Sequence, residues 1–139
     1  MMIYLAGSMK SEVIPLLANE LRALKLEVFD DWHTPGPNTD EYWQAYESRR
    51  GRNYREALRG EHARTVFNFD KYHLDRADTG ILVLPAGKSA HMEMGRLSAQ
   101  GKRTYAYFPE GYPEKWDVMY AFFTDITDSK DELIAWLLL

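Results

Sequence analysis

Residues 77–102 read ADTGILVLPAGKSAHMEMGRLSAQGK, and this stretch decides the fold. The run ILVL at residues 81–84 is apolar and of strand length, and Pro85 and Gly87 end it. Such a run fits a strand buried on both faces, as in a parallel sheet covered by helices. After the loop at residues 85–91, apolar side chains follow a helical spacing as far as Gly101. Strand, loop and helix together make half of a βαβ unit.

The loop after this strand is the first candidate for a binding site. In sheets of this kind, ligands sit beyond the carboxyl ends of the strands. Glu93 is expected in the first turn of the following helix, where the helix dipole stabilises a carboxylate and the side chain faces the crevice. We therefore predict that Glu93 is the reactive group.

The composition is that of an ordinary globular chain, with 45% hydrophobic and 27% charged residues. A length of 139 residues fits a single domain, residues 1–139. The net charge of −4 does not favour a general nucleic-acid-binding surface. Cysteine is absent, which excludes disulfides, thiolate metal sites and thiol nucleophiles. No signal peptide and no apolar run of about 18 residues is found, so a cytoplasmic location is the simplest inference.

The rest of the chain alternates between short apolar runs and helix-prone segments. Strands are expected at residues 2–6, 27–29, 81–84 and 104–108, an edge strand within 121–126, and helices at 11–25, at 70–77 and after 129. Residues 40–70 are expected to form two helices divided by glycines, as an insertion near the pocket mouth between the second and third strands. The predicted fold is α/β, a three-layer sandwich with a flavodoxin-like (Rossmann-like) parallel sheet.

The insertion is rich in arginine. Its six arginines are Arg49, Arg50, Arg52, Arg55, Arg59 and Arg64. They would suit a phosphate or polyanion surface, but Glu47, Glu56 and Glu61 are interspersed among them. We favour a solvated helix face with i,i+4 ion pairs.

Asp70 is the second candidate carboxylate. It lies near Glu93 if its helix starts at the carboxyl edge of the sheet, although a helix-starting Asp is also a common N-cap. Two carboxylates at one crevice suit chemistry at an anomeric carbon, where one attacks or stabilises an oxocarbenium-like centre and the other handles protons. Tyr4, in the first strand, is either a core ring or a hydroxyl that positions a carboxylate and tunes its pKa. Asp78 is better explained as a cap or turn residue.

Small and hydroxyl-bearing residues gather in two predicted loops. Ser8 follows the first strand, and Gly87, Lys88 and Ser89 precede Glu93. Free N–H groups near a helix N-terminus suit a phosphate or a sugar hydroxyl. GxxxxGK[ST] and GxGxxG are both absent, which disfavours a nicotinamide dehydrogenase. The histidines lack ligand spacing and GxSxG is absent, so neither a metal site nor a Ser-His-Asp hydrolase is expected.

Three segments occur in a characteristic order: YLAGS at 4–8, FDKYHLDRAD at 69–78 and LPAGKSAHMEMGRLSAQGKRTYAYF at 84–108. Their order and spacing resemble the nucleoside 2-deoxyribosyltransferase family, which includes the deoxynucleoside 5′-monophosphate N-glycosidases. The resemblance implies a flavodoxin-like fold and cleavage of the N-glycosidic bond of 2′-deoxynucleosides through a Glu nucleophile. It implies no metal and no redox cofactor.

The resemblance also suggests roles for individual residues. Glu93 matches the nucleophile, Tyr4 the tyrosine that orients it, and Asp70 the aspartate that binds the sugar or assists proton transfer. The residues expected to bind the sugar 5′ end or a 5′-phosphate, or to lie near the base, are Gly7, Ser8, Gly87, Lys88, Ser89 and Trp32.

Members of this family are commonly dimers or higher oligomers in which a neighbour's residue completes the site. Asp117 and Met119 lie in the corresponding region of this chain. The expected partners are a nucleoside or nucleotide substrate and further copies of the chain, with no nucleic acid and no membrane.

The leading hypothesis is cleavage or transfer at the N-glycosidic bond of a 2′-deoxynucleoside or its 5′-monophosphate. One alternative is a non-catalytic module that senses a nucleotide or an ADP-ribose-like ligand, because Lys88, Ser89 and the arginines would serve phosphate binding in either case. Another is a glycohydrolase for an NAD-like dinucleotide, since the same carboxylate chemistry would cleave that ribosyl bond. Base preference and the choice between transfer and hydrolysis stay open.

Overall fold

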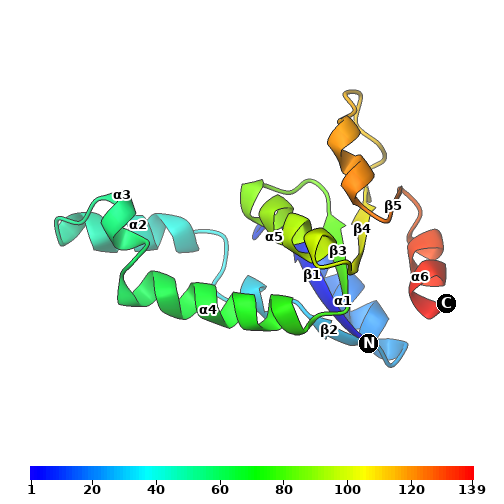
Figure 1. The fold of residues 1–139 in the computed structure, drawn as a ribbon, viewed down its shortest axis with the longest axis horizontal. Coiled ribbons are helices and arrows are strands. Elements are labelled where there is room, and N and C mark those ends of the chain that lie inside the picture. Colours follow the sequence, from blue (N-terminus) through cyan, green and yellow to red (C-terminus); the bar gives the residue numbers. More distant parts are fainter.

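A computed structural model describes all residues from 1 to 139, and five parallel strands form its single sheet (Figure 1). The strands are β1 (Met2–Gly7), β2 (Glu27–Phe29), β3 (Thr79–Val83), β4 (Arg103–Tyr107) and β5 (Asp125–Thr127). Their order across the sheet is β2-β1-β3-β4-β5. All four pairings are parallel, which is the flavodoxin-like order and confirms the predicted fold class.

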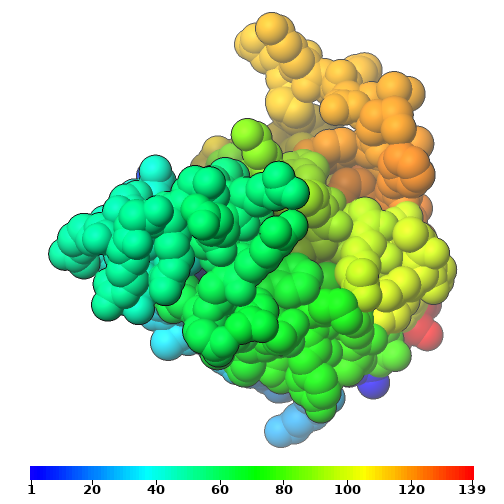
Figure 2. Space-filling view, turned by 60° about the vertical axis from the view of Figure 1, so that its left-hand side comes forward, coloured from blue at the N-terminus to red at the C-terminus, as the bar shows by residue number.

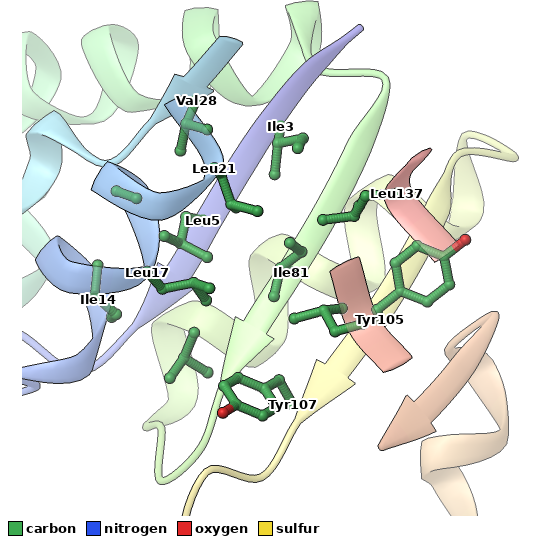
Figure 3. Packing of buried hydrophobic residues seen from close by; sticks show 13 residues of the cluster. Ile3, Leu5, Ile14, Leu17, Leu21, Val28, Ile81, Tyr105, Tyr107 and Leu137 are labelled. Carbon is green, nitrogen blue, oxygen red and sulfur yellow. The ribbon is translucent and has the colours of Figure 1, made fainter. Parts of the chain in front are cut away.

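Helices cover both faces of the sheet. One face carries α1 (Val13–Ala23) and α6 (Lys130–Leu138), and the other carries α4 (Glu61–Arg76) and α5 (Lys88–Ala99). In Figure 3, Ile3 and Leu5 of β1 lie against Leu17 and Leu21 of α1. Because side chains alternate along a strand, the intervening residues of β1 face α4 and α5. A strand that is apolar on both faces therefore requires both helical layers, and the three-layer sandwich is confirmed.

Gly80 lets α5 lie close against β3. A Cβ atom at this position would lie 2.4 Å from Leu97 Cδ1 and 2.9 Å from Met94 Sδ, which is nearer than van der Waals contact. Both side chains are buried in the core on this face. The absence of a side chain at residue 80 thus fixes the distance between α5 and the sheet, and with it the height of Glu93 above β1.

Between β2 and β3 the chain leaves the sheet as a helical arm. A 3₁₀ helix, η1 (Asp31–His33), is followed by α2 (Thr39–Arg49), α3 (Tyr54–Ala57) and the first half of α4. Figure 1 shows α2 and α3 far from the sheet, and Figure 2 shows this arm in cyan to green at the front of the molecule. The breaks in the arm fall beside Gly51 and Gly60, as predicted.

The arginines of the arm do not form the predicted i,i+4 pairs. Arg52 pairs with Glu47 across a separation of five residues, and Arg64 pairs with Glu61 across three. The other four arginines of the arm have no carboxylate within 4.0 Å. The prediction is wrong because α2 ends at Arg49 and the chain turns there, so most of these side chains do not share a helix with a carboxylate one turn away.

Several element boundaries also differ from those expected. The helix expected from residue 70 begins nine residues earlier, at Glu61, because no Gly or Pro interrupts residues 61–76. The first helix ends at Ala23, two residues early. Part of the segment expected as an edge strand is a 3₁₀ helix, η2 (Val118–Phe122), and β5 follows it. No helix combines the length and the apolarity needed to cross a membrane.

Candidate active site

Tyr4 and Glu93 meet between β1 and α5, although 89 residues separate them in sequence. The Tyr4 hydroxyl donates a hydrogen bond to Glu93 Oε2. Tyr4 is only 1% exposed. Burial raises the pKa of this hydroxyl far above its usual value, and the Glu93 carboxylate raises it further. Tyr4 therefore stays protonated and acts as a fixed donor to the carboxylate.

The Glu93 carboxyl group is only partly ionised at neutral pH. Burial raises its pKa to about 7, the Tyr4 hydrogen bond lowers it, and the charge of Asp70 raises it. The expected first-turn position is wrong. Helix α5 starts at Lys88, so Glu93 is its sixth residue and lies in the second turn. The dipole effect falls off within the first turn, and burial outweighs it here.

Asp70 lies on α4, which packs with α5 on the same face of the sheet. Its charge raises the pKa of both Tyr4 and Glu93, so the two carboxyl groups influence each other electrostatically. Its position within the helix is not the expected one, because Asp70 is the tenth residue of α4 rather than its N-cap. No hydrogen bond holds its carboxylate, and burial raises its pKa to about 6. An unpaired, half-buried carboxyl group is free to exchange a proton with a ligand.

The two loops predicted to bind a ligand lie side by side. In the β1–β3 ladder Gly7 pairs with Val83, so Ser8 and residues 84–87 leave the sheet at the same edge. Gly87 is the N-cap of α5, and Lys88 and Ser89 are its first two residues, exposed to solvent. The first N–H groups of a helix have no intrahelical partner, and they are available to an anion or a hydroxyl.

Two of the predicted binding residues, Gly7 and Trp32, also have structural contacts. A Cβ atom at Gly7 would lie 2.6 Å from Ile14 Cδ1, so this glycine permits close packing of α1. The indole Nε1–H of Trp32 donates to the carbonyl oxygen of Leu5 at 2.7 Å, and the ring packs against both core clusters. Trp32 is half-buried and fixed beside the carboxyl end of β1.

Asp117 and Met119 lie apart from the carboxylate pair. The Asp117 carboxylate caps η2 by accepting a hydrogen bond from the Met119 N–H at 2.9 Å. Both residues line a cavity of about 200 Å³ between α5 and η2, together with His91 and Tyr120. Tyr4, Asp70 and Glu93 do not line this cavity. No hydrogen bond joins either residue to Glu93 within the chain.

Phe29 and Phe69, which were not predicted as site residues, form a cluster of aromatic rings with Tyr4. The ring centroids of Tyr4 and Phe29 are 5.4 Å apart, and those of Phe29 and Phe69 are 5.8 Å apart. Phe69 directly precedes Asp70 and is half-exposed at 49%. The sequence signal that could have identified Phe69 is its position directly before Asp70 in the segment FDKYHLDRAD. No group of three or more His, Asp or Glu side chains is arranged to hold a metal ion.

No family model and no curated protein sequence matches the chain. Solved structures do match it. A 2-deoxyribosyltransferase from the psychrotolerant bacterium Bacillus psychrosaccharolyticus superposes with a TM-score of 0.63 at 19% identity, over 96% of this chain and 90% of that one. The chain has a nucleoside 2-deoxyribosyltransferase-like fold.

Two further structures share this deoxyribosyltransferase-like fold over nearly their whole length. A CMP N-glycosidase from Clostridium botulinum matches with a TM-score of 0.57 at 16% identity, over 100% of both chains. A conserved protein from Enterococcus faecalis V583 matches with a TM-score of 0.61 at 13% identity, over 97% of this chain and 95% of that one. The fold is thus shared with enzymes that transfer or hydrolyse N-glycosyl groups, and identities this low establish the fold alone.

Proposed function

We propose that this protein cleaves or transfers at the N-glycosidic bond of a 2′-deoxynucleoside or its 5′-monophosphate, with Glu93 as the nucleophile. The observation that carries the proposal is the Tyr4–Glu93 hydrogen bond, formed where Asp70 faces the same carboxylate. A buried tyrosine that donates to one oxygen of a partly buried glutamate leaves the other carboxylate oxygen for attack. The second carboxylate supplies or accepts a proton.

The reaction proceeds in two displacements. A carboxylate oxygen of Glu93 bonds to C1′ as the C1′–N bond breaks, and the base leaves with that electron pair and takes up a proton. The product is a glycosyl ester of Glu93. An incoming base nitrogen or a water molecule then attacks C1′ and releases Glu93, and the two inversions retain the configuration at C1′.

The two carboxyl groups give this reaction its pH dependence. Glu93 must be ionised to attack, and protonation of the base requires an acid, the role proposed for Asp70. With pKa values of about 7 for Glu93 and about 6 for Asp70, the pair holds one proton between these limits, mostly on Glu93, and the reactive form with the proton on Asp70 is the minor one. We expect kcat/KM to be highest between pH 6 and pH 7 and to fall on either side.

The rest of the substrate would bind along the edge formed by the two loops. The N-terminus of α5, with Ser8, Lys88 and Ser89, suits the 5′ hydroxyl or a 5′-phosphate. Phe69, half-exposed beside Asp70, offers a face on which a base can stack. Asp117 and Met119 line a separate cavity, and we propose that they act in the site of a neighbouring copy.

The decisive experiment incubates the protein with four deoxynucleosides, their 5′-monophosphates and NAD, and follows free base by chromatography. We expect release from a deoxynucleoside or its monophosphate and loss of release in Glu93→Gln, with the far-ultraviolet circular dichroism unchanged. Asp70→Asn should lower turnover by about 10²-fold or more. Full activity of Glu93→Gln would refute the mechanism, and release from NAD alone would identify a dinucleotide glycohydrolase.

A second arm of the experiment separates transfer from hydrolysis. A different free base is added, and formation of the exchanged nucleoside is measured. Saturable nucleotide binding without release of base would instead identify a sensing module. An inactive Glu93→Gln that still binds the nucleotide would show that the residue acts in chemistry rather than in binding.

A further inference from the structure

The tip of the helical arm, residues 49–59, is strongly basic. It carries five arginines and one glutamate, a net charge of +4 in a chain whose total is −4. Only Arg52 is neutralised by a carboxylate, that of buried Glu47 at 3.0 Å. The guanidinium of Arg50 lies 3.8 Å from the centre of the Tyr46 ring. The charges of Arg49, Arg55 and Arg59 have no partner within the chain.

Large apolar side chains are exposed on the arm tip and on α2. Tyr54 is 75% exposed, Leu58 53% and Tyr42 71%. Single exposed apolar residues are ordinary on a protein surface, but several on one projecting element indicate a binding surface. Tyr and Arg are also the residue types enriched in protein interfaces.

A second exposed surface has the opposite charge. Residues 108–132 carry seven acidic and two basic side chains, a net charge of −5, and Lys130 is already paired with Glu20. The same segment exposes Trp116 at 86% and Val118 at 83%. We refer to residues 108–132 as the acidic segment.

The arm tip and the acidic segment lie at different sides of the molecule. Figure 1 places α2 and α3 far from β5 and η2, and Figure 2 shows the arm and the orange part of the acidic segment apart on the surface. No ion pair joins them. The two surfaces are complementary in charge, and both expose apolar side chains. Because they lie apart in one chain, a contact between them would have to join two copies of the chain.

We propose that the arm tip docks on the acidic segment of a second copy, and that the second copy's arm docks reciprocally on the first. Each contact would neutralise arginines without partners and cover exposed apolar side chains on both surfaces. A nucleic acid would match the arginines, but it would not account for the apolar and acidic surface at residues 108–132. This inference rests on the proposed function, which includes self-association, and it names the two surfaces that would make the contact. Its test measures association and not activity, so the two proposals can fail separately.

The test is a charge swap followed by sedimentation velocity at low and high salt. The arm variant is Arg55→Glu with Arg59→Glu, and the segment variant is Glu110→Lys with Glu114→Lys. We expect the wild type to self-associate, and each variant alone to do so about 10-fold or more weakly, because attractive pairs become repulsive. In an equimolar mixture, the reversed arm of one variant meets the reversed segment of the other. The remaining contact is native, so the mixture should regain wild-type association.

A matched control is Lys25→Glu with Arg103→Glu, which changes the net charge by the same amount as the arm variant, at exposed sites away from the tip. It should associate as the wild type does. Thermal melts establish that every variant is folded. A monomeric wild type at about 100 μM, or folded variants whose mixture stays monomeric, would overturn the proposal. Binding of a labelled single-stranded oligonucleotide that is lost in the arm variant, with self-association unchanged, would overturn it in favour of a polyanion surface.

Discussion

Replacing Glu93 by Gln should stabilise the folded protein at alkaline pH while removing the proposed nucleophile. Glutamine keeps the shape and an oxygen that accepts the Tyr4 hydrogen bond, but it carries no charge. The pKa of Glu93 is raised from 4.5 to about 7, mainly by burial. This rise corresponds to about 3 kcal/mol of unfavourable free energy for the ionised form in the fold.

The direction in which stability changes with pH follows from the number of protons bound by the folded and the unfolded chain. Below pH 4.5 the group is protonated in both the folded and the unfolded chain, and its ionisation costs nothing. Between pH 4.5 and pH 7 the unfolded chain ionises while the folded protein holds the proton, so stability is lost as the pH rises. Above pH 7 the loss is complete, and Glu93→Gln should exceed the wild type by up to about 3 kcal/mol.

The assay is urea unfolding followed by tryptophan fluorescence at intervals from pH 4 to pH 9. The exposed Glu41→Gln serves as the control, and its stability should track that of the wild type across the range. The difference between Glu93→Gln and the wild type should be near zero at pH 4 and grow to its maximum above pH 7. A difference independent of pH, or a Gln variant less stable than the wild type at pH 8, would refute the reasoning from burial.

Four further predictions follow from the structure, and each has its own measurement. Tyr4→Phe removes the hydrogen bond that lowers the pKa of Glu93, so the alkaline limb of the kcat/KM profile, which the higher pKa of Glu93 sets, should move to higher pH, and an unmoved limb would contradict this role. Gly80→Ala should destabilise the protein by about 1–3 kcal/mol in urea unfolding, because its methyl group overlaps α5, and an unchanged midpoint would show that α5 yields freely. Asp75→Asn should cost about 1 kcal/mol in urea unfolding at pH 7 and progressively less as the pH falls below 4, because ion pairing with Arg96 and Lys71 holds the pKa of this partly exposed carboxyl well below its usual range, and a cost independent of pH would contradict this. Ser129→Ala removes the cap on α6 and should cost about 1 kcal/mol, visible as faster amide exchange in that helix.

The fold and the main pair of site residues could be predicted from the sequence because their signals are local. The apolar runs in β1 and β3 are bounded by small residues, and the order of the elements follows from them. The partnership of Tyr4 and Glu93 was implied by the resemblance to the deoxyribosyltransferase family, and the structure joins the two side chains by a hydrogen bond. Asp70 was expected at a helix start, but the unbroken polar helix of the arm carries it at mid-helix.

Other features depended on contacts that no local pattern encodes. The sequence did not predict that the indole of Trp32 donates a hydrogen bond to the carbonyl oxygen of Leu5, which fixes the ring beside β1. The position of Glu93 in α5 was misjudged because the helix starts at Lys88, directly after its N-cap Gly87. The arginines were predicted to form i,i+4 pairs within helices, but the breaks beside Gly51 and Gly60 divide the arm into short helices, and only Arg52 and Arg64 pair with a carboxylate, at other spacings.

By itself, the sequence determined that strands and helices alternate and that β1 and β3 are buried on both faces, since runs of adjacent apolar residues have no other stable place in water. Only the tertiary structure decided that a tyrosine and a glutamate 89 residues apart share a hydrogen bond, and that burial raises the pKa of the glutamate to about 7. The reason is that protonation depends on solvent exclusion and on neighbouring charges, and both are set by which elements pack together. The separation of a basic arm tip from an acidic segment likewise arises when the fold carries them to different sides of the molecule.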